Sequence, residues 1–387
     1  MKTETHTRRM KDVYDGLGMS ALLVCDPHTV MYFTGIEFPF ATHFPEKPVG
    51  CIFTGKNDPV LLCPYEWGRA ALDQGWSGNI STYTDNNAEN FSFIADKTAE
   101  VLKSEGLEKA DAGIEESYIP AALADMLRDR CPTVRWTAAD AALAQHRMIK
   151  NADELELMRT AAEQLEFGLI GALQHLEGSL EENGYTLAEF CERIRVHVYE
   201  TGGTAGGLAA VSAGSDSAQW YARPVGKFIP GELVRIEASS RYMGLWAVTS
   251  RMMTIGAAAE LQVRAYEENL VLKRRALEML SPGVKASSIF EAVAEIAAAK
   301  SIDFRGEFGA GHGLGAGETE APFLNMEDDT TLREGMCIVL AVYTEGPRKE
   351  LVCVKDTYYL GTKGPVCISS FHNWDSLYEV TGFRSAH

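Results

Sequence analysis

Phe308-Gly-Ala-Gly-His-Gly-Leu-Gly-Ala-Gly-Glu-Thr-Glu-Ala-Pro322 is the stretch from which the fold of this chain can be recognised. A run with glycine at every second position packs few side chains of its own, and it is found where the backbone must approach another group closely. His312 lies at its centre, and the carboxylates Glu318 and Glu320 follow. Taken alone, the stretch fits either a flexible loop whose histidine is hydrogen-bonded within the protein or one wall of an active site.

The length and charge of the chain limit what kind of protein it is. Its 387 residues predict two domains. The net charge of -18 and the lack of a Lys/Arg cluster argue against a nucleic-acid partner. No apolar run is long enough for a membrane span, and the N-terminus lacks a secretory leader. Eight cysteines without a CxxC pair predict buried reduced thiols. Together these features predict a cytoplasmic protein.

Residues 1–147 are expected to form an α/β domain, because short apolar strands alternate with helical segments. The expected strands are Ala21–Cys25, Val30–Gly35, Cys51–Thr54, Pro59–Cys63 and Ala112–Glu115, and the expected helices are residues 8–19, Asn90–Glu105 and Pro120–Arg130. An aromatic and proline-rich segment, Ile36–Pro48, is predicted to be an ordered loop.

Residues 148–387 are expected to form the second domain. Its first helix should begin at an N-cap supplied by Asn151 or Asp153. The other expected helices are Thr186–Glu200, Glu260–Leu280 and Ala286–Lys300, and the expected strands are Leu208–Ser212, Leu233–Ala238, Met243–Ile255, Met336–Tyr343 and Leu351–Tyr359.

Five motifs of this second part, taken in order, resemble the creatinase/aminopeptidase family (peptidase family M24), whose catalytic domain has the pita-bread fold. The motifs are Met148-Ile-Lys-x-x-x-Glu-Leu155, the segment from Pro230-Gly-Glu-Leu-Val-Arg-Ile-Glu237 to Arg251, Gly311-His-Gly-Leu-Gly315, Leu332-Arg-Glu-Gly-Met336 and Val352-Cys-Val-Lys-Asp356. The family includes Xaa-Pro dipeptidases and aminopeptidases, methionine aminopeptidase, creatinase and ectoine hydrolase. The resemblance implies an α/β protein in which a smaller α/β domain precedes a pita-bread catalytic domain.

The same resemblance implies that most of the family's metal ligands are replaced here. Its metallopeptidases hold two metal ions with two Asp, one His and two Glu. These positions are, in order, Glu237, Val248, His312, Ala341 and Lys355, and the family's substrate-handling histidine is Thr319. Valine and alanine cannot ligate, and lysine presents a cation. Because hard divalent ions need more donors than remain, we expect no metal and no other cofactor.

The lost ligands suggest creatinase and ectoine hydrolase, which look similar and hydrolyse C–N bonds without metal. The creatinase carboxylates fall on Ser250 and Ala341, and its catalytic histidine falls at or beside Trp220, so creatinase itself is not expected. We expect a metal-independent hydrolase of a C–N bond in a small nitrogenous metabolite. Two alternatives remain open: an Xaa-Pro metallopeptidase with unusual ligands, and a non-catalytic small-molecule-binding protein.

Three residues form the candidate catalytic group. Glu237 lies in an otherwise apolar strand, where burial should raise its pKa toward that of a general base, unless it forms an ion pair with an arginine. It would activate water or attack directly. His312 would transfer protons. Lys355 would pair with Glu237 and stabilise an anionic intermediate, or serve only the structure. Arg251 is expected to brace a strand.

Six further residues are candidates for substrate binding. They are Trp220, Tyr221, Trp246, Glu320, Phe40 and His43. The first three would enclose an apolar or cationic substrate. Phe40 and His43 belong to the segment from Phe38 to Lys47, whose aromatic residues predict an interface. The resemblance also implies an active site formed by two subunits, as in other family members. Together with this segment, it predicts a homodimer in which each N-terminal domain contributes to the partner's active site.

Overall fold

The structure is a computed structural model that describes residues 13, 16–38, 41, 44, 46–55, 57–84, 89–179, 185–203, 207, 209–219, 223–369 and 375–381. The chain divides into two compact units, Met1–Arg147 and Met148–His387. Each unit is described by itself below. Within the described residues, no helix has both the length and the apolar composition needed to cross a bilayer.

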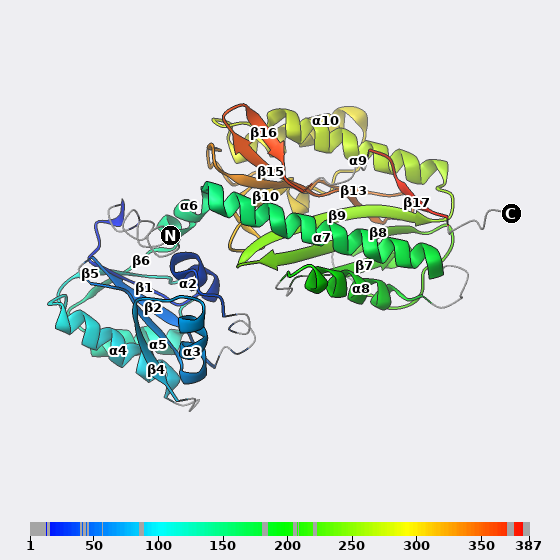
Figure 1. The fold of residues 1–387 in the computed structure, drawn as a ribbon. Helices are drawn as coiled ribbons and strands as arrows, with labels where there is room; N and C mark the ends of the chain where they lie inside the picture. Colours follow the sequence, from blue (N-terminus) through cyan, green and yellow to red (C-terminus); the bar gives the residue numbers. More distant parts are fainter. Residues whose placement is uncertain are drawn as a thin grey trace. The chain divides into compact units, whose positions relative to one another are not determined.

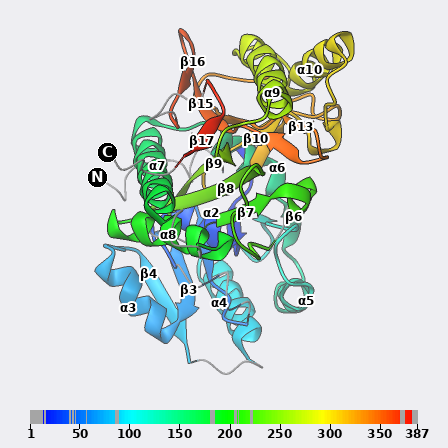
Figure 2. The same cartoon turned by 90° about the vertical axis from the view of Figure 1, so that its right-hand side faces the viewer.

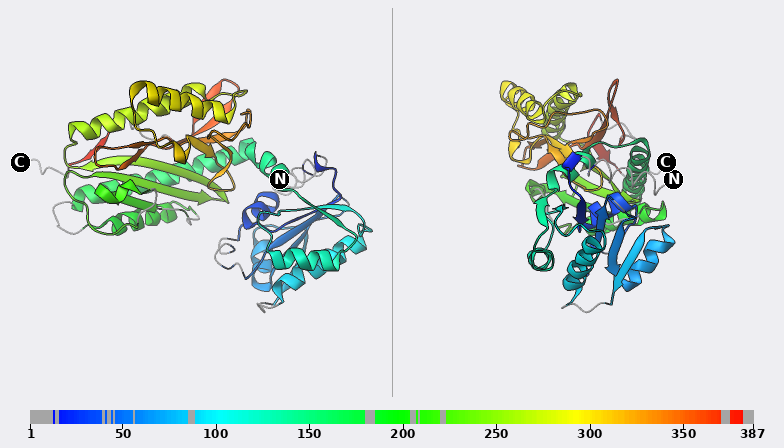
Figure 3. Two further views of the ribbon diagram at one scale, coloured as in Figure 1. Left: turned by 180° about the vertical axis from the view of Figure 1, so that it is seen from behind. Right: turned by 90° about the vertical axis from the view of Figure 1, so that its left-hand side faces the viewer.

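The N-terminal unit is built on a mixed sheet in the order β4-β3-β2-β1-β5-β6. Its antiparallel pairs are β1 with β2 and β2 with β3, and its other pairs are parallel. Apolar residues of α4 and α5 pack on the strands and cover one face of the sheet (Figure 3). The strands are β1 (Ala21–Val24), β2 (Gly50–Thr54), β3 (Val60–Pro64), β4 (Asn79–Tyr83), β5 (Asp111–Ile114) and β6 (Arg135–Ala138). The helices are α2 (Pro27–Thr34), α3 (Tyr65–Asp73), α4 (Asn90–Ser104), α5 (Ala121–Arg130) and α6 (Asp140–Met148).

The extended segment predicted at Val30–Gly35 is wrong, because these residues belong to helix α2 and its C-cap. The carboxylate of Asp26 caps the helix by accepting from the backbone N–H of His28, and Pro27 occupies the first turn. Gly35 ends the helix in the left-handed conformation, with φ of 70°. The residues from Thr29 to Thr34 are all buried, so the run has no polar face to mark it as a helix.

In the C-terminal unit, helices α7 (Ala152–Ser179) and α8 (Leu187–Glu200) pack on one face of a sheet in the order β17-β9-β8-β7 (Figure 1). Asn151 is the N-cap of α7, as predicted: its side chain accepts from the N–H of Glu154 at 2.9 Å, and Glu154 accepts from the N–H of Asn151 at 2.8 Å. Thr186 and Glu189 form the same reciprocal pair before α8. The strands are β7 (Ala209–Ala213), β8 (Leu233–Tyr242), β9 (Leu245–Ile255) and β17 (Tyr378–Val380).

A second sheet of this unit, in the order β11-β10-β12-β15-β16, packs against α9 and α10, which lie side by side (Figure 2). A separate hairpin joins β13 to β14. The helices are α9 (Glu260–Met279) and α10 (Ala286–Lys300). The strands are β10 (Gly311–Gly313), β11 (Glu320–Phe323), β12 (Cys337–Leu340), β13 (Tyr343–Glu345), β14 (Leu351–Cys353), β15 (Asp356–Gly361) and β16 (Gly364–Cys367). The predicted α/β class is thus confirmed.

The alternation of side chains along β8 separates the core from the candidate site. Val234, Ile236 and Ala238 belong to the apolar core shared with α7 and α8. Because successive side chains of a strand point to opposite faces, Arg235, Glu237 and Ser239 lie on the other face. That second face carries the polar groups considered next.

Candidate active site

Two long strands present the candidate catalytic carboxylate. Glu237 on β8 lies opposite Ser250 on β9, and Ser239 lies opposite Val248. The strand pairing thus places the two family positions Glu237 and Val248 on one face, one diagonal step apart. The backbone of Ser250 also forms an antiparallel β-bridge with that of Lys355, which brings the last of the family motifs next to Glu237.

Glu237 is buried and fully engaged by hydrogen-bond donors. Arg235 donates to one carboxylate oxygen at 2.9 Å, and the hydroxyl of Tyr343 donates to the same oxygen at 2.8 Å. The ammonium of Lys355 donates to the other oxygen. The ion pair predicted between Lys355 and Glu237 is therefore confirmed, and an arginine pair accompanies it.

The expected rise in the pKa of Glu237 is wrong. Burial does oppose ionisation, but the charges of Lys355 and Arg235 outweigh it and lower the pKa below its ordinary value. Burial likewise opposes the charge of Lys355, and the charge of Glu237 outweighs it and raises the pKa of the ammonium. The two groups are an ionised pair at neutral pH. A carboxylate with a lowered pKa is a weak general base.

His312 is the neutral group of the site. It lies on β10 between β11 and β12, and its Nδ1 is 2.9 Å from the carbonyl oxygen of Gly313. A carbonyl only accepts, so Nδ1 carries the hydrogen and Nε2 keeps a free electron pair. Burial lowers the pKa of His312 to about 4, and the charge of Lys355 adds to that effect.

We expect the imidazole of His312 to remain neutral down to about pH 5 because of this lowered pKa. Its ring carbon–proton NMR signals should stay constant from about pH 8 to about pH 5.5 and shift only below that range. A midpoint near 6.5 for His312 would contradict the prediction.

The alternating glycines serve backbone packing around His312. A Cβ at Gly311 would lie 2.0 Å from the carbonyl oxygen of Val339, and one at Gly313 would lie 2.3 Å from that of Ala321. A Cβ at Gly315 would meet the ammonium of Lys150 at 2.6 Å. The close approach expected from the sequence is therefore present, but it is to neighbouring strands and a lysine.

Glu320 and Lys150 fix the turn that follows His312. One Glu320 oxygen accepts from the N–H of Gly317 at 2.6 Å, and the other lies 3.4 Å from the ammonium of Lys150. Both side chains are buried. The turn is also held by the backbone of Trp246, whose main-chain N–H donates to the carbonyl of Gly315 at 2.9 Å. Glu320, predicted to bind substrate, is thus engaged within the chain.

Arg251 braces the segment that carries Lys355, as expected. It donates to the backbone oxygen of Lys355 at 2.5 Å and to the carboxylate of Asp356 at 2.7 Å. Lys273 of α9 pairs with the same carboxylate. The backbone of Lys355 is therefore fixed from two sides, which sets where its ammonium can reach.

The other predicted substrate-binding residues are placed only in part. Phe40, His43, Trp220 and Tyr221 lie outside the described residues. Trp246 is buried on β9, and the guanidinium of Arg241 lies 5.4 Å from its ring centroid. That stacking occupies one face of the ring.

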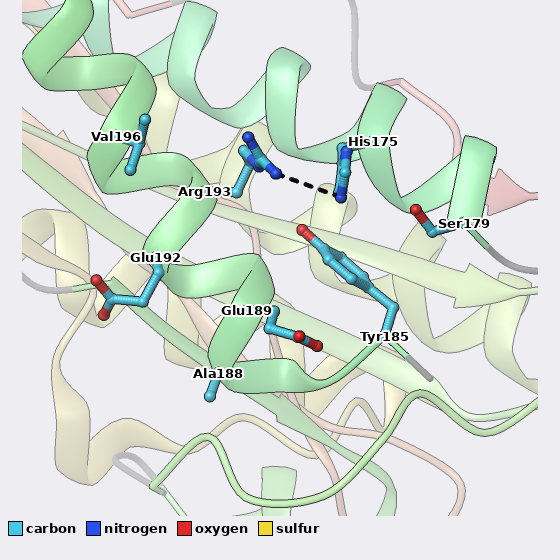
Figure 4. A pocket seen from close by; sticks show the side chains of 8 residues that line it. All are labelled: His175, Ser179, Tyr185, Ala188, Glu189, Glu192, Arg193 and Val196. Atoms are coloured by element: carbon cyan, nitrogen blue, oxygen red, sulfur yellow. Dashed lines mark hydrogen bonds between the residues drawn. The ribbon is translucent and has the colours of Figure 1, made fainter. Parts of the chain in front are cut away.

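A pocket of about 690 Å³ opens between α7 and α8. His175, Tyr185 and Arg193 line it, and Arg193 lies 3.4 Å from His175 (Figure 4). None of its lining residues belongs to the cluster around Glu237. We therefore assign the candidate site to the cluster and not to this pocket.

Several groups of the site were missed from the sequence. Arg235 could have been found, since a residue two positions before Glu237 shares its strand face. Tyr343, Lys150 and Ser239 reach the site through the tertiary fold. Ser239 donates a hydrogen bond to the side chain of Glu318, and burial raises the pKa of that half-buried carboxyl.

The family's dinuclear metal site does not fit the side chains at these positions. Val248 and Ala341 offer no donor, and the Lys355 ammonium is bound to Glu237, the first expected ligand. Among the described residues, no three His, Cys, Asp or Glu side chains lie together as metal ligands would.

Comparison with known proteins identifies relatives along nearly the whole chain. Residues 156–362 match the family described as Metallopeptidase family M24, and residues 7–149 match the Creatinase/Prolidase N-terminal domain. The Xaa-Pro dipeptidase of Lactobacillus delbrueckii subsp. lactis is 25% identical over 338 residues, covering 85% of this chain and 87% of the relative. The creatinase of Bacillus sp. (strain B-0618) is 22% identical over 342 residues, covering 85% and 80%.

The solved structures agree on the fold. The X-Pro aminopeptidase of Thermotoga maritima MSB8 superposes with a TM-score of 0.83 at 16% identity, covering 96% of this chain and 99% of the other. This likeness confirms the predicted architecture of an N-terminal α/β domain followed by a pita-bread domain.

Proposed function

This chain belongs to metallopeptidase family M24, and from that premise we propose that it is a metal-independent hydrolase of a C–N bond in a small nitrogenous compound. Its relatives include hydrolases of two kinds, a dipeptidase and a creatinase. The observation that carries the proposal is the buried ion pair between Lys355 and Glu237. It fills two positions that would each need a free carboxylate in a metal site.

In this proposal, His312 is the group that activates water. Its neutral imidazole keeps a free Nε2, which takes a proton as the water oxygen attacks the carbon of the scissile bond. The imidazolium then returns this proton to the nitrogen as the C–N bond breaks and the amine leaves. The charge of Glu237 favours the imidazolium that forms, because it raises the pKa of His312 against the effect of burial. Lys355 stabilises the negative charge that develops on the attacked group. Glu237 acts here as a fixed countercharge and not as the base expected from its sequence.

The function is tested by a screen of the chelator-treated protein against amides, lactams, amidines, guanidines and ureas, with mass spectrometry of the products. Metal content is measured on the same sample. Turnover that survives EDTA supports the proposal. Stoichiometric manganese, cobalt or zinc together with chelator-sensitive dipeptide cleavage would overturn it.

The second candidate is an Xaa-Pro dipeptidase that obtains its metal ligands from other residues. The extended match to the dipeptidase of Lactobacillus delbrueckii favours it. This candidate predicts cleavage of dipeptides with proline in the second position only after addition of a divalent metal. The same screen, run with and without manganese, separates the two.

We expect Glu237→Gln to reduce turnover of the substrate found in the screen by about 10²–10³-fold, as for loss of a preorganised electrostatic contact. Glutamine keeps the volume but removes the countercharge of both His312 and Lys355. The matched control is Glu291→Gln, which removes an exposed carboxylate of α10. Activity of Glu237→Gln near wild type would contradict the assigned role.

We also propose that the protein is a cytoplasmic homodimer whose N-terminal domain completes the partner's site. The aromatic segment from Phe38 to Lys47 motivates the dimer, and most of its residues that prompted the idea lie outside the described part. The eight cysteines are all free thiols, which supports a reducing compartment. Sedimentation at micromolar concentration tests the dimer, and a fully active monomer would count against it.

A further inference from the structure

The pocket of about 690 Å³ between α7 and α8 lies on the opposite side of the sheet β17-β9-β8-β7 from the catalytic group. Phe190 of α8 belongs to the apolar core that the two helices share with Ile236 of β8. Glu237, the next residue of that strand, points to the other face of the sheet. A molecule bound in the pocket is therefore not the substrate of the proposed reaction.

Arg193 of α8 is the cation that lines this pocket. Its guanidinium lies 3.4 Å from Nε2 of His175 on α7 (Figure 4). An arginine only donates, so Nε2 is the acceptor and the imidazole is neutral in this arrangement. Within the described part of the chain, no carboxylate forms an ion pair with Arg193. Its positive charge is therefore unmatched.

Two carboxylates also line the pocket, but each already has partners. One oxygen of Glu189 accepts from the N–H and from the hydroxyl of Thr186, at 2.7 and 2.8 Å. Glu192 accepts from Arg195 at 2.6 Å, and its side chain points away from Arg193 (Figure 4). The pocket thus combines occupied carboxylates with an arginine that lacks a countercharge.

The hydroxyl of Tyr185 is a second donor without an acceptor. It points toward Arg193 and His175 in Figure 4. Burial raises the pKa of this hydroxyl, and the charge of Arg193 opposes the rise. A guanidinium cannot accept its hydrogen, and no other described residue forms a hydrogen bond with this buried oxygen. A ligand that brings an acceptor would therefore satisfy Tyr185 and Arg193 together.

We propose that this pocket binds a small organic oxyanion, a carboxylate or a phosphate monoester, held by Arg193 and Tyr185. The guanidinium can donate two parallel N–H groups to such an anion. The anion would replace Nε2 of His175 as acceptor, and little is lost because that contact is long for a hydrogen bond. The volume is within the range of small-molecule sites, and Val196 supplies an apolar wall for the rest of the ligand. The inference goes beyond the proposed function and does not depend on it.

Calorimetric titration of the full-length protein with three aromatic probes tests the inference. The probes are benzoate, phenyl phosphate and benzamide, and the last is neutral and nearly equal in shape to benzoate. Benzoate or phenyl phosphate should bind, and benzamide should not. The anion that binds more tightly identifies the class of the ligand. This comparison uses the wild type, so it does not depend on how well a variant folds.

Two substitutions locate the site. Arg193→Gln should weaken binding of the preferred anion by about 10- to 100-fold, the usual worth of a hydrogen bond to a charged group. Tyr185→Phe removes only the hydroxyl and should weaken it by about 10-fold. The matched control is Arg264→Gln, which removes an exposed arginine of α9 and should leave binding unchanged.

Binding of neither anion at millimolar concentration, equal binding of benzamide, or undiminished binding by Arg193→Gln or by Tyr185→Phe would each overturn the inference. No probe has to be hydrolysed. A failure here is therefore distinct from a failure of the hydrolase proposal, which is judged by turnover and metal content.

Discussion

Lys355→Met is expected to destabilise the protein by about 3–5 kcal/mol and to abolish turnover. Removing one partner of a buried ion pair leaves the other charge less compensated, here by Arg235 alone, which costs far more than the pair contributes to stability. Glu237 would keep Arg235 and Tyr343 but lose the donor to its second oxygen. The measurement is urea unfolding, with the exposed Lys363→Met as the control for loss of one lysine.

The double variant Glu237→Gln/Lys355→Met separates the ion pair from general damage to the core. It removes both charges, so it should recover much of the stability that Lys355→Met loses. The pKa of His312 should also rise in Lys355→Met, because Lys355 lowers it in the wild type. A double variant less stable than either single one would show that the two side chains contribute mainly through packing.

Lys355→Met should also change how the free energy of unfolding depends on pH below neutrality. A carboxyl whose folded pKa is lowered contributes stability above its ordinary range, and this contribution is lost as pH falls through the folded pKa. Glu237 is such a group. Wild type should therefore lose stability more steeply on acidification than Lys355→Met.

The helix ends of the C-terminal unit were predictable because their signals are local. Asn151 and Thr186 each precede a glutamate by three residues, and the structure contains both reciprocal caps. Helix α2 was missed for the opposite reason. Asp26 and Pro27 are typical of a helix N-terminus, but the apolar run that follows has no polar face. Its burial depends on the surrounding fold and cannot be read from the local sequence.

The pairing of Glu237 with Lys355 was also predictable, since the resemblance placed both at positions that converge in the family. The direction of the Glu237 pKa was not. It depends on whether cations outweigh burial, and Tyr343 and Lys355 come from segments 106 and 118 residues away along the chain. The contact between Ser239 and Glu318 likewise joins segments that only the fold brings together.

Returning the family's ligands should create strong metal binding, which we do not expect of the wild type. Val248→Asp, Ala341→Glu and Lys355→Glu together would place three carboxylates beside Glu237 and His312. In the wild type, a divalent ion about 4 Å from Lys355 would meet roughly 8 kcal/mol of repulsion at an effective dielectric constant near 20. The triple variant replaces that repulsion by attraction, so its affinity for Mn²⁺ should exceed that of wild type by several orders of magnitude.

Isothermal titration with Mn²⁺ measures this difference without any substrate. Val248→Asp/Ala341→Glu, which keeps Lys355, is the matched control and should bind weakly, because the ammonium still occupies the carboxylate of Glu237. Strong Mn²⁺ binding by wild type would show that ligands from elsewhere complete the site, and it would favour the dipeptidase alternative. Strong binding by the control would show instead that Lys355 can move away, so that the missing carboxylates, and not the cation, exclude the metal.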